Sequence, residues 1–456
     1  MDTKKLRQKI LDLAIHGKLV PQDPNDEPAS VLLERINAEK ERLIKEGKIK
    51  RSKKSAKTSD TPHYEQVKLE VPNSWYMVSV SDLFLLNPKS ELDDNMKVGF
   101  IPMALVEDGF SGNHFYEERT WKDVKRGYCH FQNGDIGIAK ISPCFENRKS
   151  TIFKNLPNTY GAGTTELVIL RPIKVYTKFY LYLFKSDWYV KEGTKYFKGV
   201  VGQQRVHKEI FTDLHIPLPP FAEQQRIVEE IEYWFALIDQ IEQDKSDLQT
   251  AIRQTKSKIL DLAIHGKLVL QNPNDEPASE LLKRINPKAE ITCDNGHYPQ
   301  LPDGWVVVPM QMLCSLTDGE KLDGKEMPNL DVKYLRGERD FKTQTNGRYV
   351  AANSLLILVD GENSGEVFRT PIEGYQGSTF KQLHINENML AEYILHVINL
   401  HRKALRENKV GSAIPHLDKK LFKAIEVPVP PYDEQVRIVT VINSMHSKLD
   451  AIMENL

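Results

Sequence analysis

Cysteines are few in this sequence, and long apolar runs are absent. The chain has four cysteines and no C-x-x-C pair, which argues against a zinc ribbon or a disulfide scaffold and fits a reducing compartment. No stretch approaches the roughly 20 apolar residues of a membrane-spanning helix, and the first residues, MDTKKLRQKILDLAIHGK, lack the apolar core of a secretory signal. We therefore expect a cytoplasmic protein that binds no metal. The cysteines are Cys129, Cys144, Cys293 and Cys314.

Catalytic motifs are also missing. The strings LPPF (218–221) and VPPY (429–432) are similar to the catalytic loop of amino-methyltransferases, but Leu218 and Val429 stand where a polar residue must bond the target amino group. No Walker-type loop and no glycine-rich loop for S-adenosylmethionine is found. The string DGEK (318–321) has no matching partner for a nuclease carboxylate set. We predict no catalytic residue and no cofactor bound by this chain.

A net charge is nearly absent too, yet the charges are unevenly distributed. The whole chain carries −1, whereas residues 119–208 hold 17 Lys and Arg against 6 Asp and Glu. The following block, 221–250, holds 2 against 8. Such a cationic block predicts a basic patch that could hold a polyanion. The alternative is an ordinary solvated charged surface.

The sequence does contain two duplications. Residues 9–37 and 258–286 are identical at 25 of 29 positions, an offset of 249. HIPLPPFAEQQRIVEEIE (215–232) is repeated more weakly as EVPVPPYDEQVRIVTVIN (426–443), an offset of 211. The two offsets agree if the C-terminus is joined to the N-terminus, since this would recreate the central segment with four residues missing. The chain is therefore a circularly permuted repeat, whole in the middle and split between its ends.

Apolar residues in the central copy fall at alternating spacings of four and three, which is typical of a coiled-coil seam. The split copy shows the same spacing, so we expect two long antiparallel helices that pair about a pseudo-twofold axis. At 1.5 Å per residue, about 45 residues span about 65 Å. The alternative is that each seam packs on its own globular neighbour. The central seam comprises Ile227, Ile231, Trp234, Ile238, Ile241, Lys245, Leu248, Ile252, Thr255, Ile259 and Leu262.

Proline and glycine residues predict where these helices begin and end. Pro-Pro pairs precede each long helix, and Gly17 and Gly266 suit a left-handed C-cap after it. Pro28 and Pro277 suit the first turn of a second, shorter helix.

The regions between the repeats contain short β-type runs bounded by Gly, Asn, Asp and Pro, such as GDIGIAKI and SLLILVD. Both regions open with Pro-x-x-Trp, at 72–75 and 302–305. The predicted fold is α+β, with two mostly β domains joined by the long helices. The predicted segments are 1–59 (split repeat and basic linker), 60–214 (first β domain), 215–295 (central repeat), 296–425 (second β domain) and 426–456 (split repeat).

This pattern resembles the specificity subunit of Type I restriction–modification systems, the HsdS family. The residues that carry the resemblance are IPLPPFAEQQRIVEEIE and VPVPPYDEQVRIV, the helices after them, and the segments IAKISPCFENRKS (138–150) and DGENSGEVFRT (360–370). The resemblance covers essentially the whole chain. It implies a non-catalytic subunit whose two target-recognition domains each read half of an interrupted DNA target, while the paired helices set the spacer.

The resemblance also implies the partners. These would be double-stranded DNA, two methyltransferase subunits docked on the repeats, and restriction or translocase subunits. S-adenosylmethionine, ATP and Mg²⁺ would belong to those partners, and no membrane is involved.

Candidate DNA-binding residues are polar and basic side chains that can bond phosphates or base edges. In the first domain they are Lys140, Asn147, Arg148, Lys149, Gln203, Gln204 and Arg205. In the second they are Arg336, Arg348, Asn363, Ser378, Thr379, Lys381 and His416.

Two other classes of protein remain open from the sequence. One is a coiled-coil scaffold whose β domains bind proteins or glycans instead of DNA. The other is a methyltransferase fused to a DNA reader, which the missing catalytic and cofactor loops disfavour.

Overall fold

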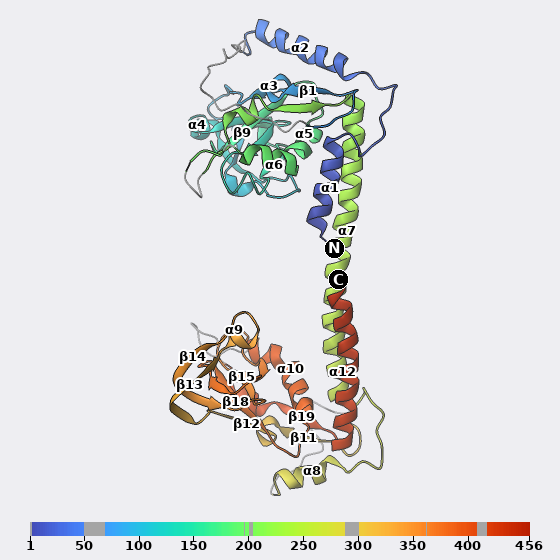
Figure 1. Ribbon diagram of the computed structural model, residues 1–456, viewed down its shortest axis with the longest axis vertical. Coiled ribbons are helices and arrows are strands. Elements are labelled where there is room, and N and C mark those ends of the chain that lie inside the picture. Colours follow the sequence, from blue (N-terminus) through green and yellow to red (C-terminus); the bar gives the residue numbers. More distant parts are fainter. Residues whose placement is uncertain are drawn as a thin grey trace. The chain divides into compact units, whose positions relative to one another are not determined.

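The computed structural model describes residues 2–49, 69–195, 197–199, 204–287, 301–361, 363–407 and 417–456. The chain divides into two compact units, Met1–Gln243 and Asp244–Leu456, each of which is described by itself (Figure 1). The division falls within the longest helix, so each unit holds one of the two expected β domains and part of the helical repeats. None of the helices in the described ranges is long and apolar enough to cross a membrane.

Unit 1 contains a first β domain built from two four-stranded sheets and a separate strand pair. One sheet has the order β2-β9-β6-β7, with bounds Phe84–Leu86, Leu167–Pro172, Ile136–Ala139 and Ser150–Ile152. The other has the order β4-β3-β8-β5, with bounds Glu117–Thr120, Lys97–Ile101, Tyr160–Gly163 and Cys129–Gln132. The strand pair joins β1 (Tyr76–Ser79) and β10 (His215–Leu218), the first and last strands of the domain, in antiparallel register.

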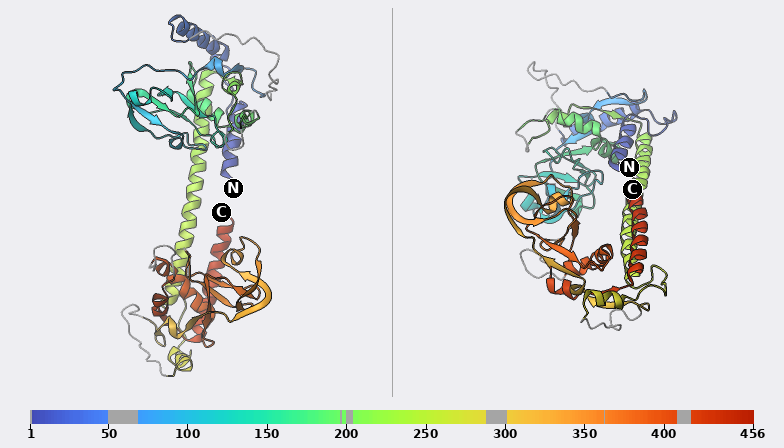
Figure 2. Two further views of the ribbon diagram at one scale, coloured as in Figure 1. Left: turned by 90° about the vertical axis from the view of Figure 1, so that its left-hand side faces the viewer. Right: turned by 60° about the horizontal axis from the view of Figure 1, so that its bottom comes forward.

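Helices surround this domain and connect it to the repeat. The helices of unit 1 are α1 (Thr3–Ile15), α2 (Ala29–Lys45), α3 (Val80–Leu83), α4 (Trp121–Val124), α5 (Thr177–Phe184), α6 (Asp187–Thr194) and the first half of α7 (Phe221–Ile264). α1 lies along the first half of α7 (Figure 2). The two run antiparallel, because Arg7 on α1 bonds Asp239 and Glu242 whereas Gln22, which follows α1, bonds Glu223.

One apolar core holds unit 1 together. Ile10, Leu11 and Ile15 of α1 are buried in the same cluster as Ile227, Ile231 and Ile238 of α7 and the aromatic residues of α5. Burial of each such side chain contributes about 1.5–3 kcal/mol. The first β domain and the helices of unit 1 therefore share one continuous hydrophobic core.

Unit 2 contains the second β domain, which has a different interior. One sheet has the order β12-β18-β15-β16, with bounds Cys314–Thr317, Phe380–Ile385, Leu355–Leu358 and Val367–Arg369. A small closed barrel is formed by β13 (Lys321–Leu330), β14 (Lys342–Val350) and β17 (Gly374–Gln376). As in unit 1, the first and last strands pair antiparallel, here β11 (Val306–Pro309) with β19 (Glu426–Val429).

The helical part of unit 2 matches that of unit 1. Its helices are the second half of α7, α8 (Ala278–Ile285), α9 (Val332–Leu335), α10 (Ala391–Glu407), α11 (Lys419–Ala424) and α12 (Tyr432–Glu454). α12 runs antiparallel to α7, since Lys256 pairs with Asp450 and Lys245 donates to the Leu456 carbonyl. Ile438 and Ile442 of α12 are buried in one core with Ile259 and Leu260 of α7.

The predicted helix ends are confirmed with one small difference. α7 begins directly after Pro219-Pro220 and α12 directly after Pro430-Pro431. Gly17 and Gly266 follow their helices with φ +65°. Pro28 and Pro277 lie at the N-cap, one residue before the predicted first turn. Most of the predicted basic linker, 45–60, lies outside the described residues.

The predicted seam is only partly covered. Ile227, Ile231, Ile238, Ile252 and Ile259 are buried, but Trp234, Ile241 and Leu248 are 41–42% exposed. Ile227, Ile231 and Ile238 share one core with α1 and the first β domain, and Ile259 shares another with α12 and the second β domain. The seam therefore packs both on another helix and on a β domain, which were the two alternatives, and it leaves some positions exposed to solvent.

Candidate DNA interface

Two of the predicted DNA-binding segments of the first β domain lie side by side. The segment after β6 begins at Lys140, and its backbone pairs with the segment around Arg205. Ser142 N donates to Gln204 O at 2.9 Å, and Val206 N donates to Lys140 O at 2.8 Å. Residues 62 to 66 positions apart in the sequence thus form one surface.

A carboxylate organises the charge of this surface. Arg205 donates to Glu166 through Nη2 at 2.8 Å and through Nε at 3.0 Å. The Arg205 hydrogen bonds and the nearby Lys140 ammonium keep the pKa of Glu166 below its ordinary value. The Arg205 side chain is still 48% exposed. Because solvent screens an exposed ion pair of this kind, Arg205 can exchange Glu166 for a phosphate at little cost in free energy.

Arg148 and Lys149, which were predicted to bind DNA, stabilise the neighbouring turn between β6 and β7 through contacts within the domain. The Arg148 side chain is 11% exposed; it pairs with Asp187, and its Nε donates to Lys185 O at 3.0 Å. Lys149 Nζ donates to Val106 O at 2.8 Å. These two cations are engaged within the domain, whereas Asn147 between β6 and β7 is exposed.

Lys185 is a residue of this region that sequence reasoning missed. It is fully buried, and its Nζ donates to Gly109 O at 2.8 Å and to Arg148 O at 3.0 Å. Burial, with a smaller contribution from Arg148, lowers its pKa to about 7. Its backbone carbonyl accepts from Gln8 on α1, so the turn that carries Asn147 is tied to the helical repeat.

In the second β domain, Arg348 and Lys381 meet at one carboxylate. Lys381 Nζ lies 2.6 Å from Asp318 Oδ2, and Arg348 Nη1 lies 3.5 Å from it. The Lys381 hydrogen bond lowers the pKa of Asp318. Asp318, the first residue of the DGEK string, thus forms ion pairs with both Arg348 and Lys381. Ser378 and Thr379 adjoin Lys381 in the turn before β18, and Ser378 is exposed.

The remaining predicted residues form a second group in this domain. Arg336 Nη2 lies 2.5 Å from Glu366 Oε2, and Arg402 of α10 lies 3.3 Å from the same oxygen. Glu366 N donates to Asn363 O at 3.2 Å, which places Asn363 beside this group. Gln203 and His416 lie outside the described residues, so their predicted roles stay predictions.

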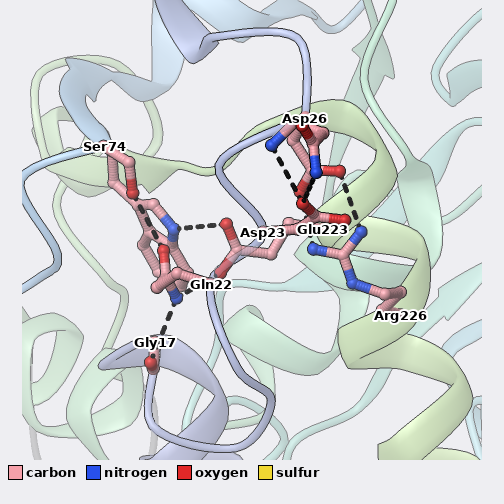
Figure 3. A network of polar contacts seen from close by, with 9 residues as sticks. Gly17, Gln22, Asp23, Asp26, Ser74, Glu223 and Arg226 are labelled. Carbon is pink, nitrogen blue, oxygen red and sulfur yellow. Dashed lines mark hydrogen bonds and ion pairs between the residues drawn. The ribbon is translucent and has the colours of Figure 1, made fainter.

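The duplicated E-Q-x-R string builds a polar network at the start of α7 (Figure 3). Glu223 is buried and accepts from Trp75 Nε1 at 2.9 Å and from Gln22 Nε2 at 2.6 Å. Arg226 Nη2 pairs with Asp26 at 2.6 Å. We call these five residues the first clasp. It joins the Pro-x-x-Trp opening of the β domain, the loop after α1 and the start of α7.

Unit 2 contains the same network, which we call the second clasp. Glu434 accepts from Trp305 Nε1 at 3.1 Å and from Gln271 Nε2 at 2.9 Å. Arg437 Nη2 pairs with Asp275 at 2.5 Å. Burial raises the pKa of both Glu223 and Glu434. Hydrogen bonds to a buried charged group stabilise by about 1.5–3 kcal/mol each, so the clasps fix each β domain on its helices.

A further glutamine extends each clasp into the β domain. Gln224 accepts from Tyr176 N at 2.9 Å, next to the start of α5, and donates to Pro219 O at 2.9 Å. Gln435 does the same with Leu390 N and Pro430 O, both at 3.0 Å. The sequence signal for the clasps was present as duplicated EQ, PNDEP and Pro-x-x-Trp strings, but sequence reasoning did not connect them.

Comparison with known proteins agrees with this two-fold construction. The model of the family described as "Type I restriction modification DNA specificity domain" matches residues 72–250 and 302–456. These ranges cover most of the chain, and each includes one β domain with a long helix. The chain therefore belongs to this family, whose specificity subunits are non-catalytic components of Type I restriction–modification systems.

Two relatives from Escherichia coli share substantial identity with the chain. The EcoAI specificity subunit is 38% identical over 419 residues, which cover 79% of this chain and 70% of the relative. The EcoEI specificity subunit is 42% identical over 326 residues, which cover 62% of this chain and only 54% of the relative.

Solved structures share the fold at low sequence identity. An HsdS subunit from Thermoanaerobacter tengcongensis superposes with a TM-score of 0.51 at 16% identity, covering 84% of this chain and 92% of that one. A chain from a study of complex assembly and conformational transition of the type I R-M system gives a TM-score of 0.60 at 17% identity, covering 84% and 93%. The predicted α+β architecture is confirmed.

Proposed function

We propose that this chain reads a bipartite DNA target, with each β domain recognising one half. The observation that carries the proposal is the duplication of the clasp. Two different β domains are mounted on equivalent helices by the same polar contacts, although their interiors differ. Two β domains that are attached to the helices in the same way but differ inside are suited to bind the same polymer, DNA, at two different base sequences.

The side chains at the two surfaces are suited to this ligand. Arg205 with Lys140 on the first domain, and Arg348 with Lys381 on the second, each present two cations around one carboxylate. Cations of this kind position a duplex through its phosphates, while exposed Asn147 and Ser378 can bond base edges. Arg336, Asn363, Gln203, Gln204, Thr379 and His416 remain part of the proposal; Arg148 and Lys149 act in it by supporting the turn.

We further propose that two methyltransferase subunits dock on the repeats. Trp234 and Met445 occupy equivalent positions and are each 41% exposed. Ile241 and Ile452 are also equivalent, and they are 42% and 47% exposed. Large apolar residues exposed at matching places are expected where two copies of one partner bind. α7, which takes part in both units, would set the spacer between the half-sites.

The chemistry of such a complex would belong to its other subunits. The described residues hold no group of three or more His, Cys, Asp or Glu side chains that could bind a metal. We propose that S-adenosylmethionine, ATP and Mg²⁺ are bound by the methyltransferase and restriction or translocase subunits. A cytoplasmic location also remains a proposal; Cys129 and Cys314 are buried free thiols, in keeping with it.

Methylation mapping tests the reading of a bipartite target. Cells that lack other methyltransferases would express this chain with its methyltransferase partner, and their genomic DNA would be sequenced for modified bases. We expect one motif made of two short half-sites separated by a fixed gap. Replacing only residues 76–218 by the equivalent domain of a relative should change one half-site and leave the other. An uninterrupted motif, or a change in both half-sites, would contradict the proposal.

A further inference from the structure

Each unit has a basic cleft between a repeat helix and a helix of its β domain, and Arg148 is the predicted DNA-binding residue that lines the first of them. The first basic cleft lies between α1 and α6 and has a volume of about 720 Å³. The second basic cleft lies among α7, α10 and α12 of unit 2 and has a volume of about 370 Å³.

Cations dominate the first basic cleft. Its walls hold six Lys and Arg against four Asp and Glu. Each of the carboxylates is already paired, for example Glu192 with Lys195 at 2.6 Å. Lys4 of α1 and Lys191 of α6 are exposed and have no ion pair with another described residue. The cleft therefore presents a net positive charge to a ligand.

The second basic cleft has no carboxylate in its walls. It is lined by Arg253 and Lys256 of α7, Lys403 of α10 and His446 of α12, with the polar side chains of Ser257 and Asn399. Lys256 pairs with Asp450, which lies outside the lining. Arg253 has no ion pair in the part of unit 2 that the structure describes.

Each cleft is also lined by a ring whose buried nitrogen has no hydrogen-bond partner among the described residues. In the first cleft this atom is Trp188 Nε1, and in the second it is His446 Nε2. Glu192 Oε2 in the first cleft also has no partner, but its other oxygen bonds Lys195. Because buried polar groups are normally satisfied, an indole N–H next to cations indicates a ligand with acceptor oxygens.

The repeat keeps a cation at one position that lines both clefts. By the offset of 249, Lys4 of the first cleft corresponds to Arg253 of the second, whereas Lys5 of the first cleft corresponds to the neutral Gln254. Gln8 and Ser257, which also correspond, line the two clefts. A need for positive charge explains the exchange of Lys4 for Arg253 better than packing does, because Lys and Arg differ in shape.

Both clefts adjoin the surfaces proposed to read DNA. Arg148 belongs to the wall of the first cleft and to the turn that carries Asn147. Lys403 of the second cleft follows Arg402, which pairs with Glu366 in the Arg336 group. A duplex bound at either surface therefore has its backbone available to the adjacent cleft.

We propose that the two basic clefts bind backbone phosphates of the DNA duplex next to each half-site. The inference rests on the proposed function and extends it: the repeat helices contact DNA themselves, and not only the β domains. Exposed lysines and arginines in the walls of a cleft suit phosphates, which carry no sequence information. The clefts would thus contribute affinity that is sensitive to salt and independent of sequence.

The test uses the full chain assembled with its methyltransferase subunits, and a duplex that carries the mapped target. Lys4→Gln with Lys191→Gln changes the first cleft, and Arg253→Gln changes the second. The association constant is measured between about 50 and 200 mM salt, where phosphate contacts are strongly salt dependent. We expect each lost contact to reduce the slope of log affinity against log salt by about 1, equally for target and non-target duplexes. Lys45→Gln on α2 and Lys283→Gln on α8, which lie outside the clefts, should leave the slope unchanged.

The outcomes separate this inference from the proposed function. A wild-type assembly with no preference for the target contradicts the proposed function. If the wild type prefers the target but the cleft variants keep the wild-type slope of log affinity against log salt, only the assignment of the clefts to DNA phosphates is overturned. Loss of methyltransferase binding without DNA, measured by light scattering, would identify a protein contact and overturn the phosphate assignment. A thermal shift of the wild type by inorganic phosphate that the variants lose, with unchanged DNA slopes, would assign the clefts to free phosphate and overturn the DNA assignment.

Discussion

Lys185 shows how a single residue connects pH to the stability of a proposed DNA-binding turn. The lysine is buried beneath Gly109 and Arg148, and both carbonyls that it contacts belong to loops. Its pKa is lowered to about 7 by burial and by the Arg148 charge, while Asp108 and Glu107 oppose this effect. The neutral amine still has two N–H groups for the two carbonyls.

This residue predicts the direction of a pH effect. Between pH 7 and the ordinary lysine pKa near 10.5, the unfolded chain binds the proton and the folded chain does not. The free energy of unfolding should therefore rise with pH across this window and fall as the pH drops toward 7. In Lys185→Met this rise should disappear, and the variant should also be less stable because two carbonyls lose their donor.

Urea unfolding followed by tryptophan fluorescence can measure the effect, since four of the five tryptophans lie in unit 1. Lys122→Met, at an exposed position on α4, should keep the wild-type pH dependence. Equal pH dependence in the wild type and Lys185→Met would contradict the assignment.

At the scale of the element, the glycines after α1 and α7 determine how closely each β domain approaches the repeat. A Cβ atom on Gly17 would lie 2.4 Å from Pro72 Cγ, and one on Gly266 would lie 2.3 Å from Pro302 Cγ. Both glycines also have φ +65°. The proline of the Pro-x-x-Trp string can thus pack against the helix end only if the residue at this position is glycine.

Three alanine variants separate the cost of the left-handed backbone from the cost of the close contact with proline. Gly47 follows α2 with φ +70° and has nothing within 4 Å of a Cβ. Gly47→Ala should cost about 1–2 kcal/mol for the left-handed backbone alone. Gly17→Ala and Gly266→Ala should cost about 1–3 kcal/mol more, because the added atom displaces a proline ring. Chemical unfolding measures the three values, and equal losses at Gly17 and Gly47 would show that the close contact does not matter.

The helices and their ends could be predicted from the sequence because the signals are local. Apolar spacing, Pro-Pro pairs and glycine C-caps gave α7, α12 and α1 to within a few residues. The exposure of Trp234 and Ile241 could not be predicted, since seam spacing does not reveal which positions have a partner within the chain. The strand order and the barrel of the second β domain depend on long-range pairing and were not predicted either.

The candidate site was predicted only in part, for a similar reason. The sequence identified two segments that the structure brings together, at Lys140 and Arg205. It did not show that Arg148 and Lys149 are occupied by Asp187 and by loop carbonyls, because burial and pairing arise from tertiary contacts. The clasps were missed although every string that builds them is duplicated.

At the scale of the whole molecule, the proposed role of α7 as a spacer predicts a change in the target. Removing residues 244–250 from α7, together with the last seven residues of the chain, would shorten the helical part by about 10 Å. This corresponds to about three base pairs of B-DNA at 3.4 Å each. We expect methylation mapping to show the same half-sites with a gap about three base pairs shorter.

A control variant keeps the length and changes the composition of the helix. Replacing residues 244–250 by another helix-forming heptad should leave the gap as in the wild type. An unchanged gap after the deletion, with methylation retained, would mean that α7 does not set the spacing.

The pairing of β1 with β10, and of β11 with β19, has a consequence for how such proteins diversify. Since each domain starts and finishes on adjacent strands, it is an insertion whose two junctions are neighbours in space. A foreign domain can be grafted there when its terminal strands keep the four-residue register and its interior keeps the contacts to the repeat helices, such as the bond from Tyr176 N to Gln224. Under the proposed function, recombination at two short DNA stretches would then replace one half of the specificity while the repeat helices stay the same.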